Sequence, residues 1–146
     1  MARLSTYLAG MVLITASVFS AVLKAEQKQT LGDWDVHYMV INTTFLTPDV
    51  AQTYGIIRSK YSALINIAVL NKASKKPLRL SVEGKATNLL GVTRKLEFRL
   101  VEEGEAIYYL ATLPFRDREK FRFAVDIQQG ETLKTLKFQQ EIFVDD

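Results

Sequence analysis

The chain has 146 residues, with 19 Lys and Arg, 16 Asp and Glu, one His and no Cys. The absence of cysteine excludes disulfide cross-links, thiol nucleophiles and zinc sites built from Cys and His. Arg3 and Lys24 are the only charged residues among the first 25, so residues 26–146 carry 17 basic and 16 acidic side chains, a net charge of +1. Such a nearly neutral segment has no strong drive toward phosphate backbones, and no nucleic-acid partner is expected.

The N-terminal residues 1–25 have the layout of a secretory signal peptide. Arg3 supplies a positive start, an apolar run extends from Leu8 to Phe19, and small residues lead to Ala25. This order predicts export to the periplasm with cleavage after Ala25. The alternative is an uncut inner-membrane anchor formed by residues 4–23, because about 20 apolar residues span a bilayer. On either interpretation, membrane contact is expected only through this segment, and only if it stays uncut.

The remaining residues, 26–146, are predicted to form a single domain. Their 121 residues are enough to bury a core without disulfides or a structural metal.

Alternation of apolar and polar residues dominates this domain. Trp34, Val36, Tyr38 and Val40 fall on one face of a first predicted strand, and a nearly continuous apolar run occupies residues 61–70. Further alternating segments lie at residues 78–82, 95–100, 106–113, 121–128 and 136–142. About seven short strands with turns between them predict an all-β, immunoglobulin-like antiparallel sandwich.

One segment, residues 47–55, has the signals of a short helix inserted between strands. Thr47 is a suitable N-cap, Pro48 fits the first helical position, and Asp49 complements the positive end of the helix dipole. Gly55 can adopt the left-handed conformation that ends a helix. We expect this insert to close an open end of the sandwich.

Several segments together resemble a known family. They are Gly32–Tyr38, Asn42, Phe45–Ala51, Tyr54–Ile56, Arg58–Lys60, Asn66–Ile67 and Ala106–Leu110. With them the chain resembles the bacterial family called domain of unknown function 4426 (DUF4426). The resemblance implies an exported, single-domain protein of Gram-negative bacteria with no assigned activity, and it brings no catalytic residues.

The residues that could support catalysis are few. Asp35 and His37 at i, i+2 on a strand could form a carboxylate–imidazole pair, but no Gly-x-Ser-x-Gly motif supplies a nucleophile. A hydrolase using His37 is therefore the least favoured function, and a solvent-facing or edge-strand pair is the favoured interpretation. No catalytic residue, cofactor or metal site is predicted, and the protein is expected not to be an enzyme.

Polar residues around the helical insert are the candidate binding site. They are Asn42, Thr47, Tyr54, Arg58 and Ser59, which could line a small cleft at one end of the sandwich. Arg58 could hold a carboxylate or a phosphate. The alternative is structural, with Asn42 and Arg58 fixing the backbone of the insert.

The function predicted from these features is a non-enzymatic periplasmic module. It would bind an unknown protein partner of the cell envelope, with edge strands available for strand addition, and contribute to envelope assembly or maintenance. The alternative is a small-ligand carrier with a pocket beside the helical insert.

Overall fold

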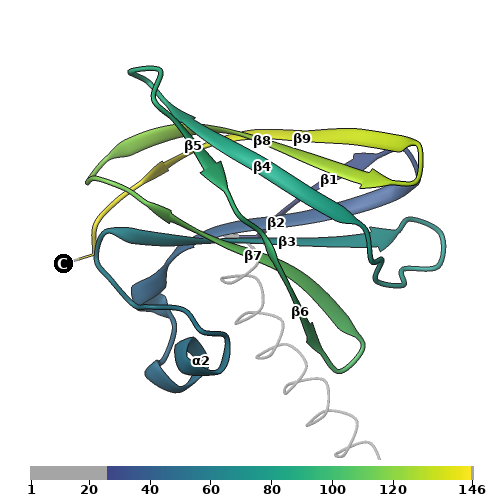
Figure 1. Cartoon of the computed structure of the whole chain (residues 1–146), viewed down its shortest axis with the longest axis horizontal. Coiled ribbons are helices and arrows are strands. Elements are labelled where there is room, and N and C mark those ends of the chain that lie inside the picture. The colour runs from purple at the N-terminus through teal and green to yellow at the C-terminus, as the bar shows by residue number, and fades with distance from the viewer. Residues whose placement is uncertain (1–25, 146) are drawn as a thin grey trace, which may run out of the picture.

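The computed structural model describes residues 26–145, which form two antiparallel sheets packed face to face (Figure 1). The five-stranded sheet has the order β1 (Glu26–Leu31), β2 (Trp34–Asn42), β3 (Ser62–Asn71), β7 (Ala106–Pro114), β6 (Arg99–Glu103). The four-stranded sheet has the order β5 (Thr93–Leu96), β4 (Ser81–Asn88), β8 (Glu119–Gln129), β9 (Thr132–Ile142). This arrangement confirms the predicted all-β sandwich. The predicted signal peptide, the alternative anchor and Asp146 lie outside the described residues.

Two short helices interrupt the strands between β2 and β3. They are the 3-10 helix η1 (Thr43–Phe45) and the α-helix α2 (Pro48–Thr53). In residues 26–145, no helix is long and apolar enough to cross a bilayer.

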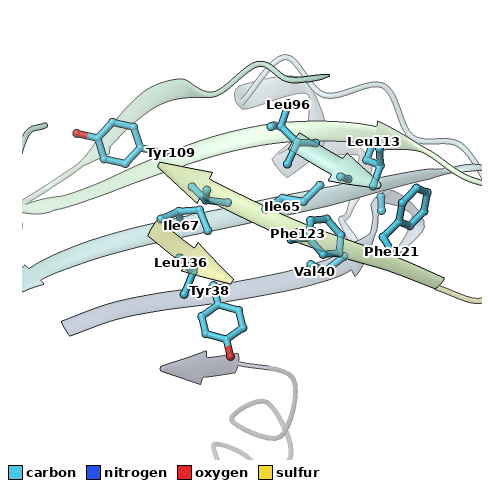
Figure 2. Packing of buried hydrophobic residues seen from close by; sticks show 14 of the residues in the cluster. Tyr38, Val40, Ile65, Ile67, Leu96, Tyr109, Leu113, Phe121, Phe123 and Leu136 are labelled. Atoms are coloured by element: carbon cyan, nitrogen blue, oxygen red, sulfur yellow. The ribbon is translucent and has the colours of Figure 1, made fainter. Parts of the chain in front are cut away.

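The alternating residues face the space between the sheets, as predicted. Twenty buried side chains fill this space, and we call them the inner cluster: Trp34, Val36, Tyr38, Val40, Ala63, Ile65, Ile67, Val69, Ala86, Leu96, Tyr109, Ala111, Leu113, Phe115, Phe121, Phe123, Val125, Ile127, Leu136 and Ile142. Figure 2 shows Val40, Ile65 and Phe123 between strands of the two sheets. Phe123 stacks on Phe138 with a centroid separation of 4.6 Å. The inner cluster is thus the larger apolar core within residues 26–145.

Residues 26–145 form nine strands where the sequence predicts about seven. One addition is β1, whose sequence EQKQTL lacks apolar alternation because it is an edge strand with a mostly exposed surface. The other arises where the predicted strand at residues 95–100 divides into β5 and β6. The chain leaves the four-stranded sheet after Leu96 and joins the five-stranded sheet at Arg99. The alternation continues through this change of sheet, so the pattern alone gives no sign of it.

Helix α2 forms within the predicted residues, but it packs against a different part of the sandwich from the one expected. Thr47 is its N-cap, and Gly55 follows it in the left-handed region with φ of +67°. Instead of closing an end of the sandwich, the insert packs on the outer face of the five-stranded sheet. It buries a second group there, the outer cluster of Ala51, Ile56, Leu64 and Leu110. The expected placement was wrong because Leu64 and Leu110, on the outward faces of β3 and β7, offered an apolar surface that had to be covered.

The two sides of the sandwich differ in how the sheets meet. On the β1–β9 side, Gln29 Nε2 donates to the Lys137 carbonyl at 2.9 Å, and Gln140 Nε2 donates to the Val40 carbonyl at 3.2 Å. These bonds join the edges of the two sheets. On the other side the sheets are joined by the chain itself, where it passes from β5 to β6.

Candidate functional site

Asn42 and Arg58, the two predicted site residues with the largest hydrogen-bonding capacity, both bond to backbone carbonyls. Asn42 is buried, and its Nδ2 donates to the Phe143 carbonyl at 2.6 Å, which attaches the C-terminal segment to the end of β2. Arg58 Nη2 donates to the Thr44 carbonyl at 3.1 Å, within the insert. The structural alternative therefore describes Arg58 correctly, whereas Asn42 fixes the C-terminal segment and not the insert.

Thr47 and Ser59 also bond within the insert. Thr47 Oγ1 accepts a hydrogen bond from the Val50 amide at 3.3 Å as the helix cap. The Ser59 amide donates to Thr43 Oγ1 at 2.9 Å, and Thr43 Oγ1 donates to the Ser59 carbonyl at 3.0 Å. This reciprocal pair joins η1 to the segment that precedes β3 and sets the path of the connecting chain.

Tyr54 connects the end of helix α2 to the edge strand β6. Its hydroxyl donates to the Glu103 carboxylate, and its carbonyl accepts from the Arg99 guanidinium. The hydrogen bond to Glu103 raises the pKa of Tyr54, since a tyrosinate would stand against a carboxylate. Two side chains from β6 thus hold the C-terminal end of the insert over the sheet.

An open cleft of about 530 Å³ lies between the insert and the five-stranded sheet. Gly55, Ile57 and Ser59 contribute one wall, Leu64 and Thr112 belong to the sheet beneath, and Arg99 belongs to β6. Of the five predicted site residues, only Ser59 lines it. A cleft beside the insert therefore exists, but on the outer face of a sheet and with mostly different residues.

The cleft lies beside a stretch of β7 that has a strand neighbour on one side only. On one side, β7 pairs with β3 through Pro114. On the other side, its pairing with β6 stops at Leu110, opposite Arg99. Within the described residues, positions 111–114 of β7 consequently have no strand paired to them on this side, although β5 lies close to β7. We call these positions the open edge. The change of sheet between β5 and β6 creates this gap.

Asp35 and His37, the sequence candidates for catalysis, lie on β2 away from the cleft. Asp35 is buried, and its carboxylate accepts from Thr30 Oγ1 at 2.9 Å and pairs with Lys75 Nζ at 2.7 Å. The hydrogen bonds from Lys75 and Thr30 lower the pKa of Asp35 below its ordinary value of 3.8. His37 borders a separate shallow hollow with Met39, Asn66 and Tyr108. Among the residues that the structure describes, no group of three His, Cys, Asp or Glu is arranged to hold a metal ion.

Sequence reasoning missed Ile57, Arg99 and Thr112 as cleft residues. Arg99 and Thr112 sit at the polar positions of alternating strands, which normally face solvent. Ile57 is 84% exposed and lies in an irregular connection. The one signal in the sequence was an isoleucine in a connection between elements, because a large apolar side chain that stays in water is unfavourable.

Comparisons with known proteins agree on the fold and leave the activity open. The family model described as "Domain of unknown function (DUF4426)" matches residues 28–145. A DUF4426 family protein from Pseudomonas aeruginosa PAO1 has a solved structure that is 42% identical in sequence, with a TM-score of 0.75, over 84% of this chain and 98% of that one. No curated protein matches the sequence.

A more distant likeness is to FetP of uropathogenic Escherichia coli strain F11. FetP expressed in the periplasm of E. coli is 10% identical, with a TM-score of 0.60, over 84% of this chain and 96% of that one. A copper-bound variant of FetP is 9% identical, with a TM-score of 0.59, over 84% of this chain and 92% of that one. At these identities the likeness concerns the fold alone.

Proposed function

We propose that this chain, which belongs to the DUF4426 family, is an exported, non-enzymatic module that binds an extended segment of another envelope protein. The supporting observation is the open edge of β7 at positions 111–114, beside a cleft of about 530 Å³. The secretory-signal layout of residues 1–25 supports the periplasm as the place of action.

An open edge beside a cleft suits recognition by strand addition. Main-chain hydrogen bonds to the free edge supply affinity, and alternate side chains of the added strand enter pockets that supply specificity. A segment lying along residues 111–114 would continue the line of β6. Its side chains on the outer face would meet Ile57 and Leu64, which border the cleft.

The two edge strands of the four-stranded sheet are less suited to this role. Strand β9 is long but carries Lys134 and Lys137, and charged lysines on an edge oppose strand pairing. The hydrogen bond from Gln29 to the Lys137 carbonyl also occupies part of that edge. Strand β5 has only four residues.

Site-specific photo-cross-linking in living cells tests this proposal. A photoreactive residue at Thr112 or at Ile57 should form an adduct of one defined mass with another periplasmic protein. The matched control is Glu83, an exposed position on β4 in the other sheet, which should form none. An Ile57→Asp substitution should weaken the Thr112 adduct. Equal adducts at Thr112 and Glu83, or none at either cleft position, would contradict the proposal.

The same cleft supports a small-ligand carrier as the second candidate. The space between the sheets is filled by the inner cluster, so a carrier would have to use the outer cleft, where apolar Leu64 and Leu110 lie near Arg99 and Glu97. Native mass spectrometry of gently purified protein should then show an added mass that a Thr112→Trp substitution removes. A mass equal to that of the protein alone would count against the carrier.

A further inference from the structure

A second surface feature lies at the end of the sandwich where the β4–β5 hairpin projects. In Figure 1 this hairpin extends beyond the neighbouring strands. It and the β7–β8 turn border a hollow of about 720 Å³. We call its apolar and basic residues the tip surface: Tyr61, Leu89, Leu90 and Val92 are apolar, and Arg94, Arg116, Arg118 and Lys120 are basic.

The tip surface exposes large apolar side chains that water disfavours. Leu89 is 75% exposed and Leu90 is 89% exposed. With Tyr61 and Val92 they are four of the ten exposed large hydrophobic residues in the described part of the chain. Exposed apolar side chains that gather on one projecting loop indicate a surface that contacts a membrane or another protein.

Three backbone amides of the projecting loop already have acceptors within the protein. Asn88 Oδ1 accepts from the Leu90 amide at 3.0 Å and from the Val92 amide at 2.9 Å, and the Gly91 amide donates to the Asn88 carbonyl at 3.1 Å. Unsatisfied amides are costly to move out of water, so these three hydrogen bonds lower the cost of moving the loop out of water. Asn88 Nδ2 also donates to Glu119 at 2.9 Å, which holds the hairpin against the β7–β8 turn.

The acidic side chains of this hollow accept hydrogen bonds from groups of the protein itself, whereas the basic side chains surround the apolar tip. Glu119 accepts from Asn88 and from the Arg116 amide, and Asp117 accepts from the Val144 amide at 2.8 Å. Four basic against two acidic side chains line the hollow. The tip surface is therefore positively charged around an aliphatic projection.

We propose that the tip surface binds a bilayer that contains anionic phospholipids. Leu89 and Leu90 enter the boundary between headgroups and acyl chains, and Arg94, Arg116, Arg118 and Lys120 contact lipid phosphates. A projecting aliphatic tip with surrounding positive charge complements a flat, negatively charged surface with hydrocarbon beneath it. The hollow shares no lining residue with the cleft, although Pro114 at the end of β7 borders it. The proposal does not rest on the proposed function. It also differs from the expectation that only the N-terminal segment contacts a membrane.

Vesicle flotation with residues 26–146 tests the proposal, since this part contains both the inner and the outer cluster and lacks the apolar N-terminal segment. The protein should float with vesicles of phosphatidylglycerol and phosphatidylethanolamine, and not with vesicles of phosphatidylcholine alone. High salt should weaken the binding, because it screens the attraction of the basic residues to phosphates. A Leu89→Asp, Leu90→Asp double substitution should weaken it at least about tenfold, since each leucine loses its burial in hydrocarbon.

Two further variants separate the tip from other surfaces. An Arg116→Glu, Lys120→Glu double substitution should lower binding to the anionic vesicles at least about tenfold, because each substitution replaces attraction to the lipid phosphates with repulsion. The matched control, Leu133→Asp, changes an exposed leucine in β9, next to the β8–β9 turn, and should bind as the unaltered protein does. Thermal unfolding of each variant confirms that it is folded.

The proposal is overturned if the unaltered protein does not float with anionic vesicles, or if the Leu89, Leu90 variant floats equally well. It is also overturned if a photoreactive residue at Leu90 forms a protein adduct while no vesicle binding occurs, a result that would make the tip a protein-docking surface. Because these experiments do not involve Thr112 or Ile57, failure here leaves the β7 cleft to be judged by its own cross-linking test.

Discussion

The inner and outer clusters are both apolar, yet they arise differently. The inner cluster has twenty members from seven strands and the β7–β8 turn, many of them fully buried, and the strands around it are joined by continuous pairing. The outer cluster has four members, each 3–7% exposed, covered by one short helix and the connecting chain after it. The five-stranded sheet thus carries a large, closely packed core on its inner face. On its outer face, where the cleft lies, it carries a small cluster covered by a short segment of chain, which we call the cover.

The largest effect is expected from truncating the centre of the inner cluster. Phe123→Ala should lower the free energy of unfolding by about 3–5 kcal/mol, since it removes buried surface and leaves a cavity beside Phe138. Urea denaturation followed by tryptophan fluorescence measures the change. The control is Phe143→Ala at a 53% exposed position, which should change the midpoint little.

A matched pair of leucines on β7 compares the two clusters directly. Leu113 belongs to the inner cluster and Leu110 to the outer one. Each substitution to Ala should cost about 2–5 kcal/mol of unfolding free energy, with Leu113 toward the upper end. The Leu110→Ala substitution should lower the unfolding free energy by less, because the chain that covers Leu110 can move into the space left behind. Equal losses would mean that the cover is as rigid as the core.

Removing the helix cap should have a smaller effect, confined to the cover. Thr47→Ala leaves the Val50 amide without its side-chain acceptor and should destabilise the protein by about 1 kcal/mol. Amide hydrogen exchange should accelerate in the insert and remain unchanged in β8. Faster exchange throughout β8 would show instead that the insert and the core unfold as one unit.

The smallest effect concerns Asp35, the buried carboxylate on β2, and it depends on pH. Its pKa is lowered in the folded protein, so its contribution to stability is complete above the ordinary value of 3.8 and is lost as pH falls through the folded value. The Asp35→Asn variant should therefore be less stable than the unaltered protein at neutral pH. The difference in their free energies of unfolding should narrow as the pH falls below 3.8. Urea midpoints at neutral and acidic pH measure this, with the exposed Asp33→Asn as the control. A gap that stays constant with pH would show that the lost interaction is not ionic.

The local elements of this fold were predictable because their signals are local. Alternation at Trp34, Val36, Tyr38 and Val40 reports which side of a strand is buried, and the structure buries all four. The Thr47 cap and Gly55 mark the helix ends in the same way, since a cap acts on amides a few residues away. The edge strand β1 was missed because its side chains are mostly exposed and leave no apolar pattern.

The candidate site was predicted less well because its parts are distant in sequence. Tyr54 meets Glu103 across 49 residues, and Asn42 meets the Phe143 carbonyl across 101. No pattern within a strand indicates such partners, so residues near the insert were assigned to a cleft that other residues line. Ser59 was placed correctly because the connecting chain itself forms one wall.

By itself, the sequence determined that residues 26–145 form paired strands around an apolar interior with one capped helix, since alternation and capping act over a few residues. Only the tertiary structure decided that the helix covers the outer face of the five-stranded sheet. It also decided that the chain changes sheets between Leu96 and Arg99 and leaves the end of β7 open. Which layer a segment joins depends on pairing between distant strands, and that pairing is set by the packing of the whole domain.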